Sequence, residues 1–364
     1  MMTTDASSSV TPTYRSNPTP ASTITSTPFR FEDQQIISPE NSTQLTQIGK
    51  WEQGMNITAL AFSPDGNILA VGCADELSQA FVNLLDVFTG RLFDRFQTNS
   101  RFLTDLAFSP NGQTLAAATL DTRILLWNVT TGDELVSPAG GEAPVASLAF
   151  NPNGKTLAYG FGITGSLFIW DLQSQQLLYE LEADIHDVNT IAFTNDGNKL
   201  ISGGWDSTVR IWNPDTGELL LDFGVLGDDT KTDDGTQSIV GYTIYKIATG
   251  PDGLFAVSAC ATDCIVQIRD ANSGTLINQI TEYPGVTGAI FSPDGQILLL
   301  ENCIDRTDLV CQQSEIVLLE VAHFTLLTRI ENAMTVAISP YGRLVAIGNS
   351  EGSVYLLGVP NSQP

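Results

Sequence analysis

The chain contains few basic residues. Its 364 residues include 16 Lys and Arg against 41 Asp and Glu, which gives a formal charge of −25 at pH 7. Lys and Arg provide the attraction of proteins to nucleic-acid phosphates and to anionic membrane surfaces. The composition therefore disfavours both of these partners. It leaves a protein or peptide, including a basic one, as the expected class of partner.

Long apolar runs and export signals are also missing. No stretch reaches the roughly 18 apolar residues that a membrane-spanning helix requires. The N-terminal segment lacks a basic region followed by about 7–15 apolar residues, the pattern of a secretory signal. As written, the chain is expected to be soluble and cytoplasmic, with no membrane span. Ser/Thr/Pro-rich tethers often follow a signal or lipid anchor, so a start site placed too late in the gene is an alternative.

Residues that carry out catalysis are scarce. The chain has two histidines, His186 and His323. It contains no G-x-S-x-G, Walker loop, H-E-x-x-H or glycine-rich dinucleotide turn placed between a strand and a helix. We therefore expect no enzymatic activity and no cofactor.

Residues 1–42 differ in composition from the rest of the chain. Ser, Thr and Pro dominate there, and few aliphatic side chains are available for packing. Such a segment cannot bury enough apolar surface to offset the entropy lost on ordering. It is expected to be disordered, with the folded part covering residues 43–360.

One phrase recurs seven times in the remainder. It reads AFSPDG, AFSPNG, AFNPNG, AFTNDG, ATGPDG, IFSPDG and AISPYG, ending at Gly66, Gly112, Gly154, Gly197, Gly253, Gly295 and Gly342. These glycines lie 42 to 56 residues apart, a period typical of propeller blades. Each copy has an alternating apolar run before the turn and three shorter runs after it. This order predicts four antiparallel strands per repeat.

The end of the third run resembles the signature of the WD-repeat family. The pairs there are Trp127-Asn128, Trp170-Asp171 and Trp212-Asn213, and the other four repeats are degenerate at this position. The F-S-P-D-G form of the turn is a bacterial-looking type. The resemblance covers roughly residues 43–360 and implies an all-β, seven-bladed β-propeller that is monomeric.

Closure of the ring is expected at the chain ends. Too few residues follow Leu357 to form a turn and a fourth strand in the last blade. Residues 43–50, just before the first blade, have the form of the fourth strand in other repeats. We therefore expect them to complete the last blade, because pairing the two chain ends removes open sheet edges.

Four residues of the fourth repeat match a structural feature of the family. The resemblance implies a buried hydrogen-bond chain formed by His186, Ser202, Asp206 and Trp212. His, Ser and Asp are also the residue types of a nucleophilic triad. The structural interpretation accounts for the spacing, and a fully satisfied polar chain would rigidify its blade.

The connection between the fourth and fifth repeats is about 14 residues longer than the others. The family's geometry implies that it lies on the face called the top, near Trp205, which is either an anchor for a partner or a cap of its own blade. Its acidic residues suit a basic peptide or a hard cation, although their spacing fails the EF-hand pattern. The alternative is a solvated acidic loop. These residues are Asp228, Asp229, Asp233 and Asp234.

Four of the five cysteines form two pairs across predicted hairpins. Cys260 and Cys264 flank a three-residue turn, and Cys303 and Cys311 flank a seven-residue one. Opposed residues on antiparallel strands lie within disulfide range, so two disulfides are possible, and they would indicate an extracytoplasmic protein. Four unrelated thiols are the alternative, whereas zinc ligation by all four fits the spacings poorly. Cys73 is left over.

Together these features predict a non-catalytic scaffold that binds a protein or peptide through the top face of a propeller. The first alternative is an exported propeller that binds a small ligand, glycan or cation. The second is a propeller enzyme, because fold alone does not exclude catalysis.

Overall fold

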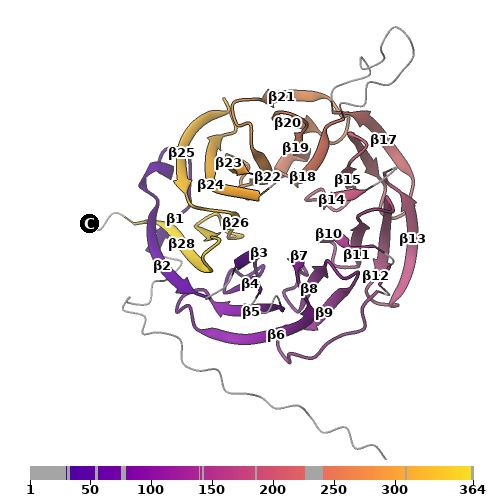
Figure 1. Ribbon diagram of the computed structural model, residues 1–364, viewed down its shortest axis with the longest axis horizontal. Helices are drawn as coiled ribbons and strands as arrows, with labels where there is room; N and C mark the ends of the chain where they lie inside the picture. The colour runs from indigo at the N-terminus through magenta and orange to yellow at the C-terminus, as the bar shows by residue number, and fades with distance from the viewer. Residues whose placement is uncertain are drawn as a thin grey trace, which may run out of the picture.

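The computed structural model describes residues 30, 33–53, 56–74, 79–138, 140–141, 143–184, 187–225, 241–307 and 310–361. Seven antiparallel sheets, the blades, are arranged in a ring (Figure 1). No helix in these ranges is long and apolar enough to cross a membrane. The expected all-β, seven-bladed propeller is confirmed.

The blades follow one another along the chain. Blade one contains β3 (Asn56–Phe62), β4 (Ile68–Ala74), β5 (Ala80–Asp86) and β6 (Leu92–Ser100). Blade two contains β7 (Leu103–Phe108), β8 (Thr114–Thr119) and β9 (Ile124–Asn128). Blade three contains β10 (Val145–Phe150), β11 (Thr156–Phe161), β12 (Ser166–Asp171) and β13 (Gln176–Glu182). Blade four contains β14 (Val188–Phe193), β15 (Leu200–Gly204), β16 (Thr208–Trp212) and β17 (Leu219–Gly224). Blade five contains β18 (Thr243–Thr249), η4 (Pro251–Gly253), β19 (Leu254–Cys260), β20 (Cys264–Asp270) and β21 (Leu276–Ile280).

Blade six contains β22 (Val286–Phe291), β23 (Ile297–Thr307), β24 (Val310–Glu320) and β25 (Thr325–Glu331). Blade seven contains β26 (Thr335–Ile338), β27 (Leu344–Gly348) and β28 (Ser353–Pro360), joined by β1 (Gln34–Gln35) and β2 (Thr46–Glu52) from the other end of the chain; η2 (Ser42–Gln44) precedes β2. The first strand of every blade faces the axis of the ring, and β6, β13, β17, β21, β25 and β2 lie on its rim (Figure 1).

Blade two departs from the four-strand pattern. Its sheet has three strands, and the position of the fourth is marked by a single bridge between Trp127 and Glu134. The Leu135 N–H donates to the Leu126 carbonyl at 2.7 Å. Pro138 follows shortly afterwards and has no N–H to continue a ladder, which is consistent with the early end of the pairing.

The two chain ends meet in blade seven. β2 pairs antiparallel with β28 from Thr46 opposite Gly358 to Glu52 opposite Ser353. This strand overlaps the segment 43–50 that was expected to complete the last blade. Because β28 pairs with β27 on its other edge, both ends of the chain are held within one sheet.

The residues just before β2 are also packed on the ring. β1 pairs with the end of β28, and Ile37, which is 1% exposed, donates its N–H to the Gly342 carbonyl at 2.8 Å. These residues belong to the segment 1–42 that was expected to be disordered. Residues 33–42 instead have a defined conformation, because Ile37 supplies an apolar anchor that the surrounding Ser/Thr/Pro composition obscured.

The apolar core lies between blades rather than within one. One cluster joins Leu84 of blade one to Leu103 and Leu115 of blade two, and another joins Trp51 to strands of blades seven and one. Side chains of a strand point alternately to the two faces of its sheet, and here both faces are covered by a neighbouring blade. Consequently each blade depends on the next one for burial.

A β-bulge recurs in the inner strands of blades one to six. The register shifts by one residue at Thr58, Thr104, Ala146, Asn189, Tyr245 and Thr287. The residue after the bulge can then reach the next blade, where its side chain accepts a hydrogen bond from a backbone N–H. The observed pairs are Leu148 to Asp105 at 3.1 Å, Ile191 to Ser147 at 3.4 Å and Ile247 to Thr190 at 2.9 Å.

Glu301 makes the corresponding bond between blades six and seven. The residue after the bulge of blade six is Gly288, and Glu301, opposite it on β23, accepts a hydrogen bond from the Val336 N–H at 3.1 Å. A Cβ atom on Gly288 would lie 2.0 Å from Glu301 Oε2, so the glycine leaves room for this carboxyl group. Burial raises the pKa of Glu301, against the opposing effects of Lys246 and of hydrogen bonds from Val336 and Thr335.

The variant Glu301→Gln should gain stability over the wild type as the pH rises. A carboxyl group whose pKa is raised by folding contributes stability that is present below its unfolded pKa, near 4.5, and is lost as the pH passes its folded pKa. Gln keeps the acceptor for Val336 and does not titrate. Glu301→Ala, which lacks this acceptor, should be less stable than Glu301→Gln by about 1–3 kcal/mol at every pH. Denaturant unfolding of the three proteins between pH 4 and 8 measures this. Parallel curves for wild type and Glu301→Gln would contradict it.

Candidate surface for partner binding

The top face carries two kinds of connection. They are the turns between the second and third strands of each blade and the segments from the last strand of one blade to the first strand of the next. The candidate binding surface predicted from the sequence lies on this top face. The acidic residues Asp228, Asp229, Asp233 and Asp234 lie outside the described residues, so the surface is built from the turns on either side.

Four large apolar side chains are exposed on this face over blades two to four. Leu120, Ile163 and Trp205 lie in the successive turns after the second strands and are 48%, 71% and 57% exposed. Phe102, in the segment that enters blade two, is 44% exposed. We refer to these four residues as the apolar patch. They lie in the connections of three successive blades, and exposed large apolar residues on one face are a feature of interaction sites.

Backbone hydrogen bonds hold the patch in place. The Leu120 N–H donates to the Phe102 carbonyl at 3.1 Å, so these two residues are fixed to each other. Asp187 joins the other two, because its carboxylate accepts from the Ile163 N–H and its carbonyl accepts from the Trp205 N–H at 3.3 Å. The patch is therefore positioned before any partner arrives, which lowers the entropic cost of binding.

Ile163 has an unusual backbone conformation. Its φ is +76°, a left-handed value that is disfavoured for β-branched residues. Such residues cost of order 1–3 kcal/mol and cluster at functional sites. The strained residue is also the most exposed member of the patch, so its apolar side chain gains nothing from burial in this chain.

The charged groups around the patch are predominantly acidic or paired. Arg123 binds Asp121 at 3.0 Å, and Arg210 binds Asp206 at 2.8 Å. Partial burial opposes the ionised form of Asp121, but hydrogen bonds from Ser100, Thr119 and Arg123 lower its pKa below the usual range. Both of these arginines have carboxylate partners, whereas the exposed Arg101 lies directly before Phe102 in the chain, so the surroundings of the patch contain charges of both signs.

The predicted hydrogen-bond chain of blade four is observed in part. The buried Trp212 Nε1 donates to Ser202 Oγ at 3.0 Å. Asp206 instead pairs with Arg210 and accepts a hydrogen bond from the Thr208 N–H at 2.9 Å. His186 lies outside the described residues. The described partners of Ser202 and Asp206 are thus those of a packed blade, and Ser202 lies at 0% exposure.

The cysteines are paired as one of the alternatives anticipated. Disulfides join Cys260 to Cys264 and Cys303 to Cys311, and Cys73 is free and buried. Burial raises the pKa of the Cys73 thiol to about 12. Within the described ranges, no group of three or more His, Cys, Asp or Glu side chains is arranged to hold a metal ion.

The second disulfide differs from the expected geometry. Cys260 lies directly opposite Cys264, but Cys303 lies opposite Ser314 and Cys311 opposite Arg306. The expected seven-residue turn is also wrong, because β23 continues to Thr307 and β24 begins at Val310. The pairing of Asp305, Arg306 and Thr307 with β24 could not be recognised from a polar sequence without alternation.

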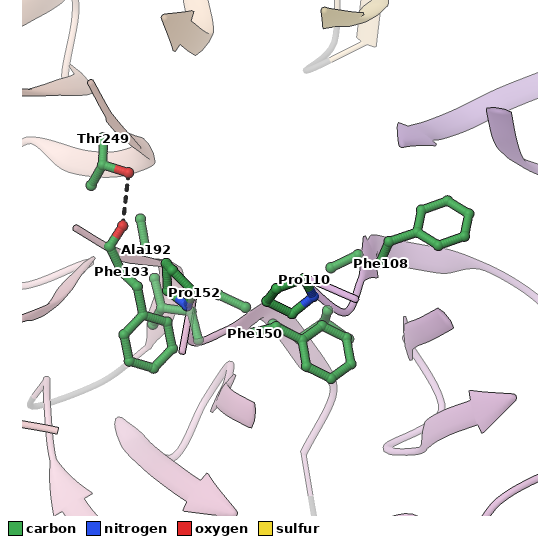
Figure 2. A pocket seen from close by; sticks show the side chains of 11 residues that line it. Phe108, Pro110, Phe150, Pro152, Ala192, Phe193 and Thr249 are labelled. Atoms are coloured by element: carbon green, nitrogen blue, oxygen red, sulfur yellow. Dashed lines mark hydrogen bonds between the residues drawn. The ribbon is translucent and has the colours of Figure 1, made fainter. Parts of the chain in front are cut away.

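A second concave region lies at the other end of the inner strands. This region has a volume of about 420 Å³. Figure 2 shows residues that line it, among them Phe108, Phe150 and Phe193 and the prolines Pro110 and Pro152 of the recurring turns. Thr249 of blade five donates its hydroxyl to the Phe193 carbonyl at 2.8 Å. These residues come from the F-S-P phrase that identified the repeat, and the lining offers no titratable group.

Comparison with protein families supports a WD-repeat propeller. Residues 90–128, 134–171 and 175–213 match the model of the WD domain, G-beta repeat, and residues 29–104 match that of the anaphase-promoting complex subunit 4 WD40 domain. The matched residues lie in blades one to four and in β1 and β2 of blade seven. These matches and the seven observed blades support a WD-repeat propeller.

Particular relatives are similar over parts of their length. The chain is 30% identical to the periodic tryptophan protein 2 homolog of Schizosaccharomyces pombe over 52% of this chain and 23% of that protein. It is 25% identical to COMPASS component SWD3 of Saccharomyces cerevisiae, over 64% of this chain and 74% of that protein. It is 28% identical to pre-mRNA-processing factor 19 of Oryza sativa, over 53% of this chain and 35% of that protein. These relatives are eukaryotic, so the bacterial-looking type of the repeat is not confirmed.

Proposed function

We propose that this protein is a non-catalytic scaffold that binds a protein or peptide through the apolar patch on its top face. The observation that carries the proposal is the exposure of Phe102, Leu120, Ile163 and Trp205 on backbone that is already fixed by hydrogen bonds. Aromatic and apolar anchors of this kind dominate binding energy at protein interfaces. The relatives include one whose name describes a complex component, which agrees with such a role.

The partner's binding segment should combine apolar and basic residues. Apolar side chains would cover the patch, and Lys or Arg would approach the acidic groups beside it, including Asp187. The formal charge of −25 would also accelerate association with a basic partner at low ionic strength.

The two disulfides favour the alternative of an exported propeller that binds a small ligand, glycan or cation. Two disulfides are typical of proteins in oxidising compartments. An exported protein can still use the same patch for a protein partner. Compartment and partner are therefore separate questions, answered by separate measurements.

The double variant Trp205→Ala/Ile163→Ala tests the proposed site. Proteins that co-purify with the wild-type chain from its native cell should bind the variant at least about tenfold more weakly, since hot-spot truncations cost more than about 1.4 kcal/mol. The matched control is Leu177→Ala/Leu178→Ala, which removes two exposed apolar side chains from the rim strand β13.

Unchanged affinity of the patch variant would remove this site from consideration. Replacement of residues 224–241 by a short Gly-Ser linker then tests the acidic connection, most of which lies outside the described residues. Loss of binding in the linker variant alone would place the site there instead.

A further inference from the structure

The two disulfides lie in different surroundings. Cys260 and Cys264 are 6% and 4% exposed and belong to an apolar core cluster with Val266 and Val286. Cys303 and Cys311 are only half-buried, and both line a small cavity of about 100 Å³. The second disulfide is therefore accessible without unfolding of the blade.

This accessible disulfide lies at the base of a projecting hairpin. β23 and β24 contain 11 residues each, whereas β19 and β20 of blade five contain 7 each. The described residues beyond Cys303 up to Cys311, namely 304–307, 310 and 311, we call the arm. Ile304 on the arm is 51% exposed.

The backbone pairing within the arm is irregular. The register shifts between Cys303 and Asp305 and again between Asp305 and Arg306. Bulges leave residues unpaired and disrupt the ladder. Cross-strand pairing is thus interrupted beside the disulfide, and the covalent bond adds a constraint at the base of the arm.

We propose that Cys303–Cys311 is a thiol–disulfide exchange site that a dithiol reductant opens selectively, releasing the arm while Cys260–Cys264 stays oxidised. A thiolate of the reductant attacks one sulfur, the Cys303–Cys311 bond breaks, and the other cysteine leaves as a thiolate. The second thiol of the reductant then attacks the mixed disulfide, forms the reductant's own disulfide and frees the first cysteine. The protein disulfide gains two electrons, the dithiol loses two, and its two protons end on the cysteines.

The selectivity follows from access. Exchange requires the attacking sulfur to reach a disulfide sulfur. The cavity beside Cys303 and Cys311 is bordered by Thr287 and Met334, of which Met334 is 41% exposed, so this face is open to a small dithiol. Attack on Cys260 or Cys264 would first require displacement of the packing between blades five and six.

Limited reduction of the full-length chain tests the proposal. Protein purified without reductant is treated with dithiothreitol for increasing times, newly formed thiols are alkylated, and the peptides of each pair are quantified by mass spectrometry. Cys303–Cys311 should be reduced at least about tenfold faster than Cys260–Cys264 in the native protein, because access controls the rate. In denaturant the ratio should fall close to one.

Equal native rates, or faster reduction of Cys260–Cys264, would overturn the proposal, as would five free thiols before treatment. Hydrogen exchange measures the structural consequence in the same samples. Amides of the arm should exchange faster after limited reduction, and the variant Cys303→Ser/Cys311→Ser should show the same increase without reductant. The matched variant Cys260→Ser/Cys264→Ser should leave the exchange of the arm unchanged before reduction. An arm that exchanges equally in all of these samples would show that the disulfide does not constrain it.

Discussion

A chain that lacks residues 43–50 should lose the stable closed ring. The deletion removes most of β2, which supplies the outer strand of blade seven and pairs with β28. It also displaces Trp51, whose ring packs against Gly90 of blade one so closely that a Cβ there would lie 1.8 Å from the indole nitrogen. Both the last sheet and its contact with the first blade are then incomplete.

The expected result is unfolding or oligomerisation. The exposed edge of β28 would offer unpaired N–H and C=O groups to another chain, and each blade depends on its neighbours for burial. Size-exclusion chromatography and thermal unfolding measured by circular dichroism report the outcome. Deletion of eight residues, 3–10, near the start of the chain is the matched control and should leave both measurements unchanged. A monomer with an unchanged melting temperature after deletion of 43–50 would refute this account of closure.

The variant Gly204→Ala should destabilise the protein by about 3 kcal/mol, since overpacking against backbone has few routes of relief. The added Cβ would lie 1.6 Å from the Asp187 carbonyl oxygen and 2.4 Å from Asp184 Oδ2. The Asp187 backbone must move, and its carbonyl is the acceptor for the Trp205 N–H. The substitution therefore affects both the stability of the ring and the position of the apolar patch.

Gly162→Ala is the control for this effect. Gly162 lies at the corresponding edge of blade three, and the nearest atom to its added Cβ is the Pro144 carbonyl oxygen at 3.8 Å. It should be tolerated within about 0.5 kcal/mol. Denaturant unfolding measures both variants, and partner binding below the unfolding transition should weaken for Gly204→Ala alone. Equal free energies of unfolding for the two variants would show that the backbone at Asp187 can move away from the added Cβ atom without destabilising the protein.

Part of the candidate surface could be inferred from the sequence. Trp205 was identified because a tryptophan at the tip of a polar turn has no place in the core. Leu120, Ile163 and Phe102 were not, since a single apolar residue in a turn carries no periodic signal. Hydrogen bonds through Asp184 and Asp187 link the turns of blades three and four, and these bonds connect residues far apart in the chain.

The sequence by itself determined the ring. Alternating apolar residues and the repeated Pro-Asp-Gly turn specify local hairpins, and seven such hairpins in a fixed period have one common way to cover both faces of every sheet. The tertiary structure decided what local patterns cannot encode. Ile37 is buried because strands of blades six and seven, far away in the sequence, pack around it. In blade two, pairing of the fourth strand stops after Leu135.

Glu301 replaced the missing side chain of Gly288 because the two residues oppose each other across strands, a relation that depends on register. The arm beyond Cys303 formed because β23 and β24 stay paired in a segment whose sequence does not alternate between apolar and polar residues. The contacts of Ile37 with Gly342 and of Glu301 with Val336 join residues that are distant in sequence, so they stabilise the protein only once the fold has formed.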